Sequence, residues 1–158
     1  MAEDFVGTFD HSLDNKGRTI VPSAFREQLG TGFTAAMNSE WKALALYPSQ
    51  KWNCIRERLS RMRDTDPAAM AYKRMVSAYA MHVDELDSQG RVLLPKVMRE
   101  KAGLGQRILF IGMGDYVEVW DAARYAQHES ASLARMDELI AYVDERYNAC
   151  SRTNEGGI

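Results

Sequence analysis

The chain has 158 residues, of which 46% are hydrophobic and 27% charged, so it can bury a core and does not have the composition of a disordered protein. Its formal net charge is −2, which gives no reason to expect a nucleic-acid partner, and no apolar run approaches the roughly 18 residues that span a bilayer. The first residues lack the order of a secretory signal and the two cysteines, Cys54 and Cys150, lack metal-ligand spacing, so we expect a cytoplasmic globular protein with free thiols, no bound metal and no cofactor.

Residues 5–48 form the first predicted unit, which is rich in strands. An alternating run leads into an Asp-x-x-Gly turn, where Gly17 can adopt a positive φ, and a β-branched triplet follows. We expect the two strands around this turn to pair as a hairpin. Pro22 suits the first turn of a helix that ends at Gly30. The predicted elements are strands at 9–13 and 19–21, a helix at 22–29 and strands at 33–37 and 44–47.

Residues 49–80 predict two connecting helices. The first, over 49–62, carries Trp52, Ile55 and Leu59 at helical spacing, and the second covers 67–80. The stretch from Lys51 to Arg63 contains five basic residues against one acidic residue, a pattern that could offer phosphate contacts but is more typical of a solvated helix face.

Residues 81–125 predict a second unit of the same kind, with strands at 82–86, 92–94, 108–111 and 116–120 and a helix at 95–102. Asp121 is a suitable N-cap for one long helix over 121–148. Its apolar residues between Met136 and Tyr147 recur at helical spacing, which indicates a partner surface. Residues 149–158 are polar and are expected to be a flexible tail.

The second unit repeats the first at an offset of 73 residues. Leu13–Gly30 lies over Leu86–Gly103 without gaps, and eight of the 18 positions are identical. Average residue usage would give about one or two coincidences. The offset continues through the last strand of each unit and pairs Trp52 with Tyr125. We infer a duplication, in which two units that are each too small to stand alone bury their apolar faces against each other as a pseudo-twofold pair.

The two Asp-x-x-Gly-Arg segments resemble the signatures of the MraZ family. The first runs from Leu13 to Arg18 with Pro22 and Arg26 after it, and the second runs from Leu86 to Arg91 with Pro95 and Arg99 after it. The resemblance covers about residues 5–125 and implies an α+β fold with a mainly β core. In that fold, two tandem AbrB-like swapped-hairpin halves form a pseudo-twofold barrel with peripheral helices.

The family resemblance also implies a function. It implies a nucleoid-associated transcriptional regulator that forms ring-shaped homo-oligomers and is not an enzyme. Its partner would be double-stranded DNA with G-rich direct repeats, upstream of the division and cell-wall gene cluster and including its own promoter. Membranes and small-molecule substrates are not expected as partners.

The resemblance places the DNA-binding site on the two Asp-x-x-x-Arg segments, which contribute Asp14, Arg18, Asp87 and Arg91. An arginine can donate two hydrogen bonds to O6 and N7 of guanine in the major groove, and the aspartate four residues earlier can brace it. Lys16 is expected to contact phosphate. The second segment has glutamine instead at the corresponding position, which would make the two halves unequal. Neighbouring turn residues complete the candidate set: Asn15 and Gln89.

Other interpretations remain open at this point. Each Asp–Arg pair alone could be an ordinary surface ion pair worth about 0–1 kcal/mol, and the recurrence of the pair at the same place in both units is what favours a functional role. The three histidines are too scattered for a metal or catalytic site, and the methionines and tryptophans are more typical of core and interface than of a cofactor pocket. The alternative function is a ring-forming scaffold whose DNA binding is secondary. An enzyme with paired carboxylates is a weaker third reading.

Overall fold

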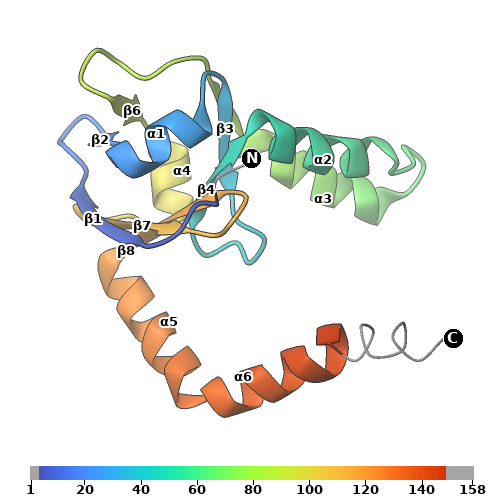
Figure 1. Ribbon diagram of the computed structural model, residues 1–158. Helices are drawn as coiled ribbons and strands as arrows, with labels where there is room; N and C mark the ends of the chain where they lie inside the picture. Colours follow the sequence, from blue (N-terminus) through green and yellow to red (C-terminus); the bar gives the residue numbers. More distant parts are fainter. Residues whose placement is uncertain (1–3, 149–158) are drawn as a thin grey trace, which may run out of the picture. The chain divides into compact units, whose positions relative to one another are not determined.

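In the computed structural model, residues 4–148 are described, so the predicted tail at 149–158 and Cys150 lie outside the described residues. The chain divides into two compact units, residues 1–122 and 123–158. Both sequence repeats lie almost entirely in the first unit, whose elements are coloured blue to light orange in Figure 1.

The first unit contains eight strands and four helices among the described residues. They are β1 (Thr8–Ser12), β2 (Arg18–Ile20), α1 (Ser23–Leu29), β3 (Phe33–Met37), β4 (Leu44–Pro48), α2 (Ser49–Ser60), α3 (Pro67–Ala78), β5 (Met81–Val83), β6 (Arg91–Leu93), α4 (Lys96–Lys101), β7 (Arg107–Gly112) and β8 (Val117–Asp121). Every predicted strand and helix of the two repeats is present, with ends that differ from the prediction by a few residues. Pro22 and Pro95, predicted to lie in the first turn of their helices, occupy the N-cap positions of α1 and α4, one residue before the observed first turn.

Most strand pairs join one repeat to the other: only β3–β4 and β7–β8, among the described strands, pair within a repeat. Six strands form one antiparallel sheet in the order β1-β7-β8-β4-β3-β5, and β2 pairs with β6 as a separate two-stranded ribbon. The predicted hairpins are therefore wrong, because β1 pairs with β7 instead of β2, and β5 pairs with β3 instead of β6. Pairing of strands between the repeats is favoured because a repeat that paired only with itself would leave strand edges and an apolar face uncovered.

The register of these pairs has the symmetry of the duplication. Thr19 faces Val92 across the ribbon, and Ala45 faces Glu118 across the β4–β8 pair. In both cases the two facing residues are 73 positions apart, which is the offset of the repeat. The strands do not form the closed barrel that the resemblance implied: among the described strands, β1 and β5 end the sheet without pairing to each other, while β2 and β6 pair only with one another. The architecture is a mixed α/β fold built on an antiparallel sheet, in agreement with the coarser α+β prediction.

A continuous apolar core fills the space between the sheet, the ribbon and helices α1 and α4. Phe25 on α1 is 1% exposed and makes edge-to-face contacts with Phe5 and Phe9 at ring-centroid distances of 5.5 and 5.0 Å. Met98 on α4, at the corresponding position of the second repeat, is 2% exposed. A smaller cluster on the other side of β3 and β4 packs Tyr47 against residues of α2.

One buried polar network joins the two repeats. The side-chain amide of Asn38 donates to Oε2 of Glu118 at 2.7 Å, and the indole N–H of Trp120 donates to Oε1 of the same carboxylate at 3.0 Å. Oδ1 of Asn38 in turn accepts from the backbone N–H groups of Lys42 and Ala43. The buried carboxylate therefore has hydrogen-bond donors on both oxygens, as a buried polar group requires.

The second unit contains the rest of the C-terminal helical region. The single helix predicted over 121–148 is interrupted: α5 (Ala122–Ala134) ends before Arg135, whose φ and ψ are −113° and 15°, and α6 (Met136–Val143) continues into a π-helical turn, Asp144–Asn148. A backbone with these angles cannot continue the α-helical hydrogen-bond pattern. No described helix is both long enough and apolar enough to cross a membrane.

Candidate nucleic-acid interface

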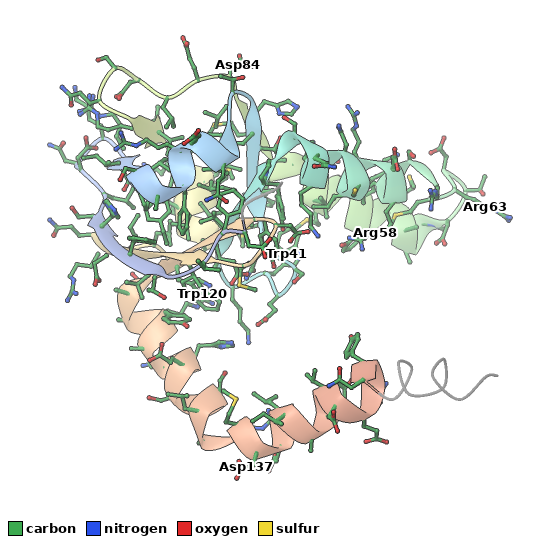
Figure 2. All side chains as sticks on the ribbon, viewed as in Figure 1. Trp41, Arg58, Arg63, Asp84, Trp120 and Asp137 are labelled. Carbon is green, nitrogen blue, oxygen red and sulfur yellow. The ribbon has the colours of Figure 1, made fainter. Side chains whose placement is uncertain are left out.

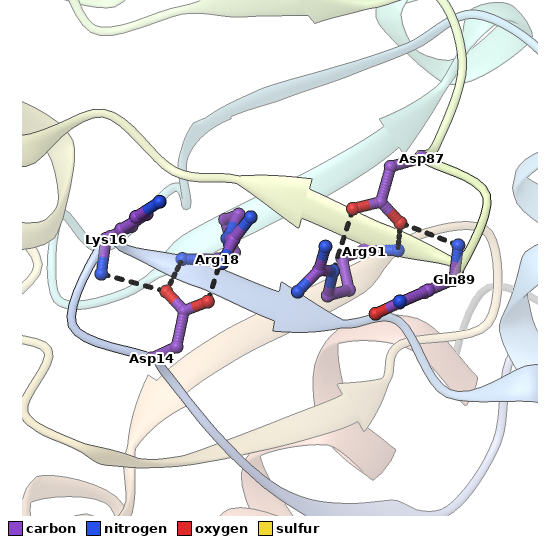
Figure 3. A network of polar contacts seen from close by, with 6 residues as sticks. All are labelled: Asp14, Lys16, Arg18, Asp87, Gln89 and Arg91. Carbon is purple, nitrogen blue, oxygen red and sulfur yellow. Dashed lines mark hydrogen bonds and ion pairs between the residues drawn. The ribbon is translucent and has the colours of Figure 1, made fainter.

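The first Asp-x-x-Gly-Arg segment folds into a compact loop around the carboxylate of Asp14. Oδ1 accepts from the backbone N–H groups of Lys16 and Arg18, each at 2.9 Å, and Oδ2 accepts from Nε of Arg18 at 2.8 Å (Figure 3). The backbone closes the same loop, because the N–H of Asp14 donates to the carbonyl of Arg18 and the N–H of Gly17 to that of Asp14. The arginine is thus fixed to the loop from which it projects.

The second loop has the same geometry around Asp87. Its Oδ1 accepts from the backbone N–H groups of Gln89 and Arg91 at 2.9 and 2.8 Å, and its Oδ2 accepts from Nε of Arg91 at 2.8 Å. A chance surface ion pair would not be expected to reproduce the backbone and side-chain hydrogen bonds in both repeats. The Asp–Arg pairs predicted from sequence are therefore equivalent structural units.

Glycine is required at the same place in each loop. Gly17 and Gly90 have φ values of +84° and +76°, in the left-handed region that costs other residues about 1–2 kcal/mol. These conformations turn the chain from the aspartate into β2 and β6. The glycines therefore determine the direction in which each arginine leaves its loop.

The two-stranded ribbon brings the loops together. Because Arg18 faces Leu93 and Ile20 faces Arg91, antiparallel pairing puts all four side chains on one face, while Thr19 and Val92 point into the core and are 2% and 4% exposed. Ile20 and Leu93 are 42% and 56% exposed. Figure 3 shows the loops at opposite ends of the ribbon, with Arg18 and Arg91 between them.

The hydrogen bonds within each loop also set its charge. They lower the pKa of Asp14 to about 2, chiefly through the backbone N–H of Arg18 and then through the side chain of Arg18 and the N–H of Lys16. The pKa of Asp87 is lowered by the corresponding bonds from Arg91 and Gln89. Both carboxylates are therefore ionised at neutral pH and hold the guanidinium by Nε. Within the described part of the chain, the terminal nitrogens of Arg18 and Arg91 donate to no other residue, so each can donate to a ligand.

The remaining candidates from the sequence lie at the rims of the loops. The side chains of Asn15, Lys16 and Gln89 are exposed, beside the arginines that they precede. Ile20 and Leu93 were not among the site residues predicted from the sequence, since an aliphatic residue in a short strand is normally assigned to the core. Arg26 and Arg99, which the structure places against the loops, were treated only as parts of the family signature. Strand register was the signal that could have found Ile20 and Leu93.

The other chemistry-bearing residues do not join this site. His11 packs against Phe110, and His82 shares a hydrogen bond with Thr34. Residues 4–148 contain no group of three or more His, Cys, Asp or Glu side chains that could hold a metal ion. The basic run of the sequence lies on α2 and the turn after it. Figure 2 shows Arg58 and Arg63 there, away from the ribbon.

Comparison with known proteins gives a consistent result. The family model described as "MraZ protein, putative antitoxin-like" matches residues 5–75 and 79–141. The chain is 36% identical over 135 residues to the transcriptional regulator MraZ of Lactiplantibacillus plantarum, which covers 85% of this chain and 94% of the relative. It is 40% identical over 124 residues to the protein of that name from Thermomicrobium roseum, covering 77% of this chain and 84% of the relative. It is 39% identical over 140 residues to the protein of that name from Desulfitobacterium hafniense, covering 86% of this chain and 96% of the relative.

Each of the two loops that carried the resemblance lies inside one of the two matched segments, and the matches extend over most of the chain and of its relatives. The chain belongs to the MraZ family.

Proposed function

We propose that this protein is a sequence-specific DNA-binding transcriptional regulator that reads guanines with Arg18 and Arg91. The observation that carries the proposal is the β2–β6 ribbon, in which two loops of identical geometry present guanidinium groups on one exposed face. Its relatives are named transcriptional regulators, which supports the same class of function.

The ribbon has a suitable form for the major groove. A two-stranded antiparallel ribbon fits this groove, where the guanine edge offers two acceptors. Arg18 and Arg91 are diagonal neighbours in the register, a relation that separates two residues by about 7–8 Å. This is close to two base-pair steps of about 3.4 Å each, so one ribbon can contact two guanines in the same G-rich segment.

Each remaining residue has a distinct part in this proposal. Asp14 and Asp87 hold the Nε side of the arginine, so that less side-chain entropy is lost on binding. Lys16 contacts phosphate, and Asn15 and Gln89 contact the backbone or base edges beside it. Ile20 and Leu93, exposed between the arginines, pack on apolar base atoms such as the thymine methyl group.

The family resemblance supplies the targets in our proposal. The sites are G-rich direct repeats upstream of the division and cell-wall gene cluster, including the protein's own promoter on the nucleoid. A ring of identical subunits would present ribbons at regular intervals, so that weak contacts add up through effective concentration. The exposed apolar residues of α6 and its extension, such as Ile140, Val143 and Tyr147, support self-association.

The test is a DNA-binding titration of the Arg18→Ala/Arg91→Ala double variant. Each lost bidentate contact should cost about 1–3 kcal/mol on promoter DNA and much less on random DNA. Arg→Lys variants should lose nearly as much, because an ammonium group cannot reproduce the planar fork. Lys16→Ala should weaken binding to both DNAs equally and reduce the salt slope by about one.

The matched control is Arg61→Ala/Arg63→Ala, which removes the same charge from exposed positions just after α2. All variants are first checked for the melting temperature and oligomer size of the parent. If the folded Arg18→Ala/Arg91→Ala protein still prefers its promoter to random DNA as strongly as the parent does, the proposed readout is wrong. A DNA affinity that barely changes with salt would instead favour the scaffold function.

A further inference from the structure

Two helix arginines lie against the DNA-reading loops, and each belongs to the opposite repeat. Arg99 of α4 covers Gly17: a side-chain carbon at Gly17 would lie 2.7 Å from Cζ and Nε of Arg99. Arg26 of α1 covers Gly90, where an added carbon would overlap its guanidinium group. The absence of a side chain at each glycine therefore creates the space that the arginine of the other repeat fills.

The Nε of each of these arginines donates a hydrogen bond to a backbone carbonyl of its own repeat. Nε of Arg26 donates to the carbonyl of Val21 at 2.8 Å, and the backbone N–H of Val21 donates to the carbonyl of Gly90 at 3.0 Å. Val21, Arg26 and Gly90 thus form one connected unit across the repeats. The equivalent unit is Leu94, Arg99 and Gly17, with hydrogen bonds of 2.9 Å from Nε of Arg99 to the carbonyl of Leu94 and from the N–H of Leu94 to the carbonyl of Gly17.

The geometry points to Arg26 and Arg99 as positioning residues, each of which holds the arginine loop of the other repeat in its DNA-binding form. We infer that Arg26 positions the Asp87–Arg91 loop and that Arg99 positions the Asp14–Arg18 loop. This inference rests on the proposed function of the loops. It adds that neither repeat can present its own loop correctly, because the support comes from the other repeat.

Arginine suits this role better than another cation. Its Nε–H provides the anchor to the backbone carbonyl, and its flat terminal group fits over an α-carbon that has no side chain. Lysine has neither a donor at the Nε position nor a planar end. The contact is also selective: it touches the residue next to the reading arginine, where a small rotation of the positive-φ glycine would redirect the side chain.

The first test uses the free protein and needs no DNA. Amide hydrogen exchange is measured at Lys16, Arg18, Gln89 and Arg91, whose N–H groups donate to the loop aspartates. In Arg26→Ala, exchange at Gln89 and Arg91 should accelerate about tenfold, while Lys16 and Arg18 stay as in the parent. Arg99→Ala should give the opposite pattern. Equal acceleration in both loops, or none, would overturn the inference.

The second test is a set of double-mutant cycles on promoter DNA. Loss of Arg26 should matter little once Arg91 is absent, so Arg26→Ala and Arg91→Ala should be non-additive by about three- to tenfold in Kd, whereas Arg26→Ala and Arg18→Ala should add. For Arg99→Ala the expectation is reversed: its effect should be non-additive with Arg18→Ala and additive with Arg91→Ala. If Arg26 simply contacts phosphate, its effect will add to both reading arginines, and the positioning role is refuted.

Lysine variants cover the case in which an alanine variant does not fold. Should Arg26→Ala or Arg99→Ala not fold, Arg26→Lys and Arg99→Lys retain the charge and the aliphatic stem, and they should show the same cross-repeat pattern of exchange. Parent-like exchange in the folded lysine variants would contradict a role for the anchored fork. Failure of the proposed function is distinguishable, since it would be seen as normal DNA binding by Arg18→Ala/Arg91→Ala whatever the exchange pattern.

Discussion

Separating the two repeats tests whether they depend on each other for folding. Four of the six strand pairings among the described residues join one repeat to the other. We therefore expect that fragments 1–66 and 81–125, expressed separately, will not fold as monomers. The fragments keep every strand and helix of the two repeats, so the prediction concerns the contacts between repeats.

The β4–β8 pair allows an estimate of the free energy lost when the repeats are separated. Leu44 faces Val119 and Leu46 faces Val117 across the repeats, and all four side chains are 0–1% exposed. Full burial of such side chains contributes about 1.5–3 kcal/mol each, so each fragment, which holds two of the four, loses up to about 3–6 kcal/mol from this pair alone. The other three cross-repeat pairs add to this loss, and a whole domain is typically stable by only about 5–15 kcal/mol, so an isolated repeat should unfold.

The assay is thermal unfolding by circular dichroism, with light scattering on each fragment and on their equimolar mixture. The mixture should recover a cooperative transition, because it restores the cross-repeat pairs. Symmetry of the register also allows a fragment to pair with a second copy of itself, which would give a midpoint that rises with concentration. A monomeric fragment that melts cooperatively at a concentration-independent temperature would refute the reasoning.

Three further predictions concern single features of the structure. Asn38→Ala should lower the free energy of unfolding by about 1–3 kcal/mol in chemical denaturation, because it leaves Oε2 of the buried Glu118 without its donor; an unchanged midpoint would contradict this. An NMR titration should place the pKa of Asp14 at about 2, below its usual 3.8, so its loop hydrogen bonds should be intact above about pH 4 and lost only as the pH falls through about 2; a midpoint near 3.8 would show that the carboxylate is not held as described. Parent protein should bind promoter DNA about fourfold more tightly, per methyl group contacted, than the same DNA with uracil in place of thymine. Ile20→Ser/Leu93→Ser should remove that preference, because serine has no methyl group, and equal affinity of the parent for both DNAs would exclude the methyl contact.

The sequence was sufficient for what depends on neighbouring residues. The duplication, the Asp-x-x-Gly turns and the helices after Pro22 and Pro95 all follow from local propensity or from comparison of one half with the other, and each is present. The Asp–Arg pairs could also be predicted, because residues four apart around a tight turn lie within reach of each other. The break at Arg135 was missed, since nothing in the apolar spacing around it differs from that of a continuous helix.

Only the tertiary structure decided which strands are partners. An alternating pattern tells which side chains of a strand are buried, but it does not distinguish a neighbour in the same repeat from the equivalent strand of the other. The hairpin prediction failed for this reason, and with it the chance to see that Ile20 and Leu93 share an exposed face with the arginines. The contacts of Arg26 with Gly90 and of Arg99 with Gly17 join residues 64 and 82 positions apart by their numbers. Such contacts arise from packing one repeat on the other, which minimises exposed apolar surface over the whole unit and leaves no local signal in the sequence.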